Sequence, residues 1–194
     1  MNSKLPGHYH ESLSHVSKHD RKMIPVLKDL IRINKDRITI YEKAAHEDNE
    51  LDPEVRKLIY SMATDSRSYV NELHAEVIRM GAPPVTQETI TGKIYLFWLD
   101  MKTDLGEFPG VKDMSAFPGP NTISSPAAKD VAAMLKAIDR VEVAVQKAYR
   151  HALDGGDLIE DIYRLVEKQL WALEWTHGQM NNLNHAKYDQ SNRS

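Results

Sequence analysis

Glu174 and His177 are the residues whose types and spacing most clearly indicate chemistry. They lie three residues apart in "ALEWTHGQM", and residues at this spacing project from the same face of a helix. His177 also falls within an apolar stripe, where the pattern predicts a leucine. A carboxylate and an imidazole one turn apart can both reach one metal ion, and this mixture of ligands suits iron, manganese or zinc.

A further carboxylate, Glu142, interrupts the apolar stripe of the preceding helical segment. Because bare burial of a carboxylate is very costly, Glu142 must be paired, ligated to a metal or neutral. The first half of the chain repeats this pattern with amides: Asn34 takes the place of the carboxylate, and Asn71 with His74 repeats the three-residue spacing of the first pair. The two halves therefore mirror each other around one polar centre.

The sequence supports two hypotheses for this polar centre. Two cations with only two carboxylates would be poorly neutralised, so the sequence predicts at most one Fe, Mn or Zn ion. In the alternative, the bundle is a non-catalytic structural or interaction protein without a metal, and the same residues are solvated or hydrogen-bonded in the core. Neither hypothesis assigns a catalytic residue. The predicted metal ligands are Glu142, Glu174, His177 and His74.

Four long segments with helical periodicity must position these residues. The second is bounded by Asp52 as N-cap, Pro53 at the first helical position and Gly81 after its end. The fourth is predicted to open with a capping box of Asp157 and Glu160. The segments run from about Met23 to His46, Pro53 to Met80, Pro126 (after a Ser125 cap) to Leu153, and Asp157 to about Ala186.

The connection between the second and third segments is long. It contains a shorter aromatic helix at about 88–105 and a Pro/Gly-rich loop at 106–126. Tight turns make each helix pair antiparallel, while the crossover lets the second and third helices run parallel. The predicted fold is all-α: a ferritin-like antiparallel four-helix bundle over residues 21–187, with the crossover at about 86–125 and flexible tails at 1–20 and 188–194.

Composition excludes several function classes. The 194 residues carry a net charge of −3 with both signs interspersed, so no basic surface for nucleic acid or an anionic membrane stands out. There is no cysteine, which excludes disulfides, zinc–thiolate sites and iron–sulfur clusters. The first residues show no apolar leader segment, so a cytoplasmic protein is expected.

The chain resembles the bacterial ferritin-like proteins classed as domain of unknown function 2383. The resemblance implies a four-helix ferritin-like bundle, bacterial and cytoplasmic, and implies no established reaction. The chain departs from the family's usual pattern in the first helix at Arg37 and Ile40. The segments that carry it are "LIRINKDRITIYEKAA", "NELHAEVIRMGA", "FWLDMKTDL", "IDRVEVAVQKAY" and "EKQLWALEWTHGQM".

Two tryptophans, Trp171 and Trp175, lie off the main stripe of the fourth helix. They are expected to cover the crossover helix, with its Phe97 and Trp98, or to pack across an interface between copies. The sequence therefore predicts a homodimer with the crossover helix or the outer face of the fourth helix at its interface.

Overall fold

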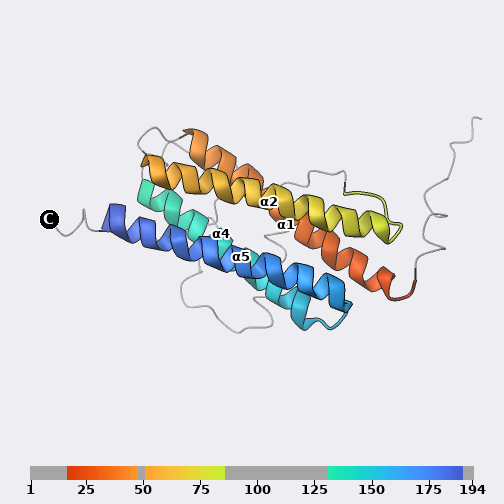
Figure 1. Ribbon diagram of the computed structural model, residues 1–194. Coiled ribbons are helices and arrows are strands. Elements are labelled where there is room, and N and C mark those ends of the chain that lie inside the picture. Colours follow the sequence, from red (N-terminus) through yellow and green to blue (C-terminus); the bar gives the residue numbers. More distant parts are fainter. Residues whose placement is uncertain (1–16, 48–50, 86–130, 190–194) are drawn as a thin grey trace, which may run out of the picture.

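Four long helices form the part of the chain that the structure, a computed structural model, describes: residues 17–47, 51–85 and 131–189 (Figure 1). A short π-helical turn, η3 (His185–Asp189), continues the last helix, and no strand occurs within these ranges. The all-α prediction is confirmed for the described part. The helices are α1 (Asp20–Glu47), α2 (Pro53–Arg79), α4 (Val131–Asp154) and α5 (Glu160–Asn184).

Ion pairs at the two ends of the bundle define the directions of the helices. Near the start of α1, Lys22 contacts Asp157 of the turn before α5 at 2.9 Å. At the opposite end, Lys187 of η3 contacts Asp52 at 3.3 Å and Glu54 at 2.9 Å, beside the start of α2. Neighbouring helices are therefore antiparallel, and α2 ends and α4 begins at opposite ends of the bundle (Figure 1).

The predicted crossover helix at 88–105 and the loop at 106–126 lie outside the described residues, as does the Ser125 cap. The helical bundle is thus confirmed in its four long helices, whereas the ferritin-like crossover stays a prediction. The predicted tails fall largely outside the described ranges as well. Within these ranges, no helix is long and apolar enough to cross a membrane.

The predicted ends of α2 are confirmed. The carboxylate of Asp52 accepts from the backbone N–H of Glu54 at 2.8 Å and of Val55 at 3.4 Å, and Pro53 follows as the first helical residue. After the helix, Gly81 has φ 78°, the left-handed conformation that glycine adopts without strain.

Two predicted helix starts are wrong. α1 begins at Asp20 rather than near Met23, because Ser17 and Asp20 cap it: the Asp20 N–H donates to Ser17 Oγ at 3.0 Å, and that hydroxyl donates to the Asp20 carboxylate at 2.7 Å. α5 has no capping box, since its N-cap is Ile159 without a side-chain bond. The carboxylate of Asp157 instead contacts Lys22.

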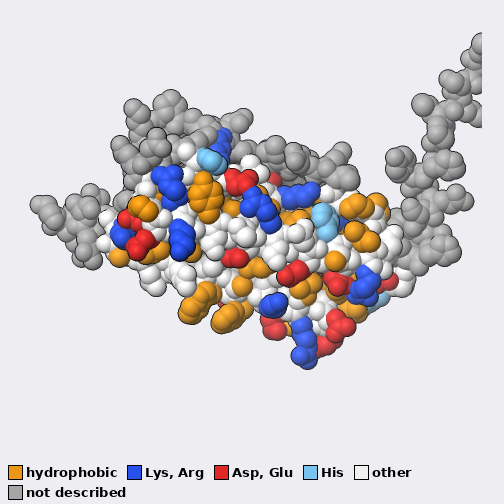
Figure 2. Space-filling model, turned by 45° about the horizontal axis from the view of Figure 1, so that its top comes forward, with side chains coloured by type: hydrophobic (Ala, Val, Ile, Leu, Met, Phe, Trp, Pro, Cys, Tyr) orange, Lys and Arg blue, Asp and Glu red, His pale blue; other side chains and the backbone are white. Residues whose placement is uncertain are grey.

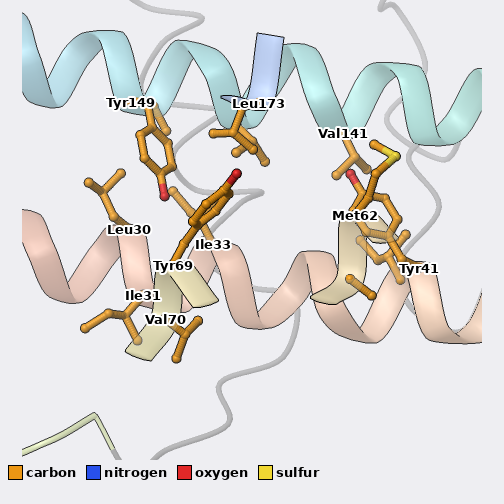
Figure 3. Packing of buried hydrophobic residues seen from close by; sticks show 14 of the residues in the cluster. Leu30, Ile31, Ile33, Tyr41, Met62, Tyr69, Val70, Val141, Tyr149 and Leu173 are labelled. Carbon is orange, nitrogen blue, oxygen red and sulfur yellow. The ribbon is translucent and has the colours of Figure 1, made fainter. Parts of the chain in front are cut away.

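One hydrophobic core lies between the four helices. Figure 3 shows Tyr149 reaching from α4 toward α1, beside Leu30 and Ile33, while Tyr69 of α2 points toward Leu173 of α5. Four methionines of the helical stripes are buried in this core, namely Met62, Met80, Met134 and Met180. On the face shown in Figure 2, hydrophobic side chains lie in small groups separated by charged ones.

Candidate functional site

A buried ion pair joins α1 and α4 in the interior of the bundle. The side chains of Arg37 and Glu142 are 1% and 0% exposed. Arg37 Nε donates to Glu142 Oε1 at 2.9 Å, and Arg37 Nη2 donates to Glu142 Oε2 at 3.0 Å. This two-pronged contact matches the planar geometry of guanidinium and carboxylate, and it engages both carboxylate oxygens.

The charges of this pair balance each other away from water. Burial raises the pKa of the Glu142 carboxyl, and the charge and hydrogen bonds of Arg37 oppose that rise. Because a guanidinium stays protonated in proteins, the ionised form of Glu142 is the one that leaves no net charge in the core.

Two more side chains of α1 surround the guanidinium. Asn34 and Tyr41 lie three residues before and four residues after Arg37, which places all three on one helix face. Arg37 Nε donates to the Tyr41 hydroxyl at 3.2 Å, and the guanidinium carbon lies 5.1 Å from the centre of the Tyr41 ring. Arg37 Nη1 also donates to Asn34 Oδ1 over 3.4 Å. The aromatic ring and the amide thus compensate for the water that Arg37 gives up.

From Asn34, hydrogen bonds continue through the other helices. Asn34 Nδ2 donates to the Tyr149 hydroxyl of α4 at 2.6 Å, and that hydroxyl donates to Gln169 Oε1 of α5 at 3.0 Å. Gln169 Nε2 then donates to Glu72 Oε2 of α2 at 2.9 Å. All four helices contribute to this chain of bonds. We call it the central network; its members are Arg37, Glu142, Asn34, Tyr149, Gln169 and Glu72.

The donors of the central network all point away from Arg37. An ionised carboxylate only accepts hydrogen bonds, so Glu142 and Glu72 terminate the chain at its two ends. Burial raises the pKa of Tyr149, which keeps the proton that it donates. Glu72 is half-buried and also accepts from Ser68 Oγ at 3.3 Å, so this end of the network reaches the bundle surface. The arrangement fixes one relative position of the four helices.

His177 lies between residues of α4, outside the central network. Its Nε2 is 2.7 Å from Asp139 Oδ1, and its Nδ1 is 2.9 Å from Gln146 Nε2. An amide nitrogen only donates, so Nδ1 accepts from Gln146. Asn181 Nδ2 of α5 lies 3.2 Å from Nε2, beside Asp139. Burial is the main influence on the pKa of Glu142, with Arg37 and then His177 lowering it, so His177 lies within electrostatic reach of Glu142.

The two other predicted ligands have partners of their own. Glu174 is 40% exposed and forms an ion pair with Arg150. His74 Nε2 accepts from the backbone N–H of Val85 at 3.2 Å. Burial, together with the charge of Lys35, lowers the pKa of His74. The structure therefore gives Glu142 and His74 separate partners. Glu174 and His177 are connected only indirectly, because Arg150 donates to Glu174 and to Gln146 Oε1, and Gln146 contacts His177.

These donor sets do not fit a resident metal ion. Both oxygens of Glu142 accept from Arg37, whose fixed positive charge repels a second cation. Within the described ranges, no group of three or more His, Cys, Asp or Glu side chains is placed to hold a metal. Metal binding by Glu142, Glu174, His177 and His74 stays a prediction, and the arrangement of these side chains does not favour it.

Sequence reasoning missed two members of the central network, Arg37 and Gln169, and placed Glu72 near the centre only as a spare carboxylate. Arg37 has a detectable signal, because it lies on the same helix face as Asn34 and Tyr41, inside an apolar stripe. Gln169 is 1% exposed and directly precedes Leu170, which belongs to the stripe. Glu72 follows Asn71, the residue chosen from the mirrored spacing, and Asn71 is exposed.

Comparison with known proteins gives one family match. The model of a family described as "Domain of unknown function (DUF2383)" matches residues 22–107, which include α1 and α2. The resemblance found in the sequence is thereby confirmed. No curated protein and no solved structure matches the chain.

Proposed function

Since the family model that matches residues 22–107 is described only as a domain of unknown function, we propose a function from the geometry of the bundle. The protein is a non-catalytic helical bundle that acts by association, and its polar centre is closed by Arg37 rather than by a metal ion. The observation that carries this proposal is the buried two-bond contact between Arg37 and Glu142.

The guanidinium of Arg37 neutralises an inward carboxylate, as a metal ion does in other helical bundles. Metal sites in helical bundles use inward carboxylates from several helices, and the ion neutralises them. Here the guanidinium neutralises Glu142 and orients Asn34, and Asn34 connects to α4 through Tyr149. The centre is then complete within the polypeptide, and its stability does not depend on a metal supply.

The bonding of the central network also supports a structural role. Tyr149 donates to Gln169 and accepts from Asn34, so its hydroxyl is engaged in both directions. A hydroxyl that acts as a nucleophile or proton carrier needs an adjacent base, and Gln169 is an amide that does not titrate. The network therefore favours a fixed scaffold that presents its outer surface to a partner.

Thermal unfolding with and without metal tests the proposal. The full chain is treated with a chelator and then mixed with Fe(II) under anaerobic conditions, Mn(II) or Zn(II). We expect the midpoint to change by less than about 1 °C, because an ion that does not bind the folded state cannot stabilise it. A bound ion at 100 times its Kd would add about 2.7 kcal/mol, or a rise of about 5–11 °C for a chain of this size.

Variants assign any effect that is observed. A metal-dependent rise that disappears in the Glu174→Ala, His177→Ala double variant would contradict the proposal and support the metal site predicted from the sequence. These positions lie outside the central network, so the variant keeps the Arg37–Glu142 contact. A control with alanine at His8, His10, His15 and His19 identifies binding by the N-terminal histidines.

A further inference from the structure

Trp171 and Trp175 form an exposed stacked pair on the outer face of α5. Their side chains are 66% and 60% exposed, and their rings lie 6.0 Å apart at an interplanar angle of 13°. Four residues of helix rise about 6 Å, so the rings stack along the helix axis. Burying such rings is strongly favourable, and an exposed pair of this kind marks an interaction surface.

Gly178 lies on the same stripe of the helix, seven residues after Trp171 and about 10 Å farther along the axis. A Cβ built on Gly178 meets no atom of the described residues within 4 Å. Glycine weakens a helix interior relative to alanine, and Gly178 is not among the residues with positive φ in the described ranges. The residue thus leaves a gap beside the projecting rings that the fold of one chain does not require.

The projecting rings and the gap complement each other across a twofold axis. We propose that a second copy of this chain covers the face, with the two α5 helices antiparallel. If the axis passes midway between Trp171 and Gly178, Trp171 of each copy lies over Gly178 of the other, and the two Trp175 rings meet near the axis. This inference rests on the proposed function and names the partner that it leaves open.

The two tryptophans supply about half of the area that a stable interface with this occupant needs. A tryptophan can bury up to about 250 Å², so the exposed parts of the two rings offer about 300 Å² per copy and about 600 Å² for the pair of copies. A stable interface buries at least about 1,200 Å² in total. The rest would come from the exposed stripe between Arg164 and Asn182, which is about 27 Å long.

Charges flanking the tryptophans are compatible with this register. Lys168 of one copy comes opposite the uncharged Asn181 of the other, so like charges do not meet there. Glu174 is already paired with Arg150 of its own chain.

Light scattering of the full chain at tens of micromolar tests the inference, with one variant that fills the gap and one that removes the rings. Gly178→Gln adds a polar side chain that one chain accommodates easily and that improves the helix, yet it collides with Trp171 of the second copy. Trp171→Ala, Trp175→Ala removes the apolar contact. Asn71→Gln, at an exposed position of α2, is the matched control.

We expect the wild type and Asn71→Gln to show twice the mass of one chain. In both test variants, dimer dissociation should rise at least about 30-fold, the loss typical of a central interface residue. Their far-UV circular dichroism should stay that of a folded bundle, which separates loss of association from loss of fold. A Gly178→Gln variant that dimerises like wild type would overturn the proposed register.

A monomeric wild type would overturn the inference. In a Trp98→Phe background, tryptophans shielded from iodide in that monomer would assign residues 86–130 of the same chain as the cover. Quenching of Trp171 and Trp175 by iodide would show that nothing covers this face. Neither outcome changes the expectation of metal-independent stability, which the unfolding experiment measures separately, so the failures of the two proposals are distinguishable.

Discussion

Removing one partner of the Arg37–Glu142 pair should destabilise the protein far more than removing both. Arg37→Leu leaves a buried carboxylate without its donors, and Glu142→Leu leaves a buried guanidinium without its counter-charge. With exposures of 1% and 0%, water cannot replace the lost partner. Each single variant should lose about 3–5 kcal/mol of unfolding free energy, which lowers the melting midpoint by about 6–20 °C for a chain of this size.

The double variant Arg37→Leu, Glu142→Leu removes both charges at once. Its loss should be only about 1–2 kcal/mol, because leucines restore apolar packing and the unpaired groups are Tyr41 and Asn34 Oδ1. The pairwise coupling energy from the four proteins should therefore exceed about 3 kcal/mol. Urea unfolding followed by circular dichroism gives all four free energies.

A surface ion pair provides the control. Arg67 and Glu42 join α2 to α1 with side chains 47% and 43% exposed. Arg67→Leu should cost less than about 1 kcal/mol, since exposed pairs contribute little. A buried ion pair is excluded if Arg37→Leu costs no more than Arg67→Leu, or if the losses of the two buried single variants simply add in the double variant.

Three further substitutions test other parts of the structure. Tyr149→Phe leaves two buried amides short of a partner and should cost about 2–3 kcal/mol in urea unfolding; a loss below about 0.5 kcal/mol would show that the hydroxyl is dispensable. Burial raises the pKa of Asp36 from 3.8 to about 7. The folded state therefore keeps the full contribution of protonated Asp36 to its stability below pH 3.8, and it loses this contribution as the pH rises through 7. Asp36→Asn should therefore add about 1–2 kcal/mol near pH 8, after allowing for solvent screening, with no gain near pH 3, and a variant no more stable than wild type near pH 8 would contradict this. Burial and then Lys35 lower the pKa of His74 below 6.5, so the stability of its neutral form is present above 6.5 and is lost as the pH falls through the lower folded value. His74→Gln keeps an acceptor for Val85 without titrating, and its melting midpoint should fall less between about pH 7 and pH 5 than that of wild type; equal falls would exclude His74 as the cause.

The helices could be predicted because their signals are local. The apolar stripes repeat with the helical period, and the start and end of α2 depend on Asp52, Pro53 and Gly81 within a turn of each boundary. The start of α5 could not be predicted in the same way. Asp157 has the type and spacing of a cap, yet its carboxylate contacts Lys22, which lies 135 residues away in the chain.

The polar centre was predicted in part. Glu142 was recognised as a buried carboxylate that needs compensation, but its partner Arg37 lies 105 residues away, and a single arginine in a stripe does not indicate whether it reaches solvent or the core. The Glu174–His177 spacing is real, but α5 is rotated so that Leu173 and Gln169 are buried and Glu174 lies about 100° away from Leu173 around the helix. Rotation of one helix against its neighbours depends on packing, which a spacing rule does not include.

Elemental analysis of the untagged protein, purified from cells grown with added iron, manganese and zinc, tests most directly whether Arg37 takes the place of a metal. We expect well under one Fe, Mn or Zn ion per chain after dialysis, with the same value for wild type and for Glu174→Ala, His177→Ala. About one ion per chain in wild type, lost in that double variant, would contradict it and would show that the carboxylate and imidazole predicted from the sequence hold a metal.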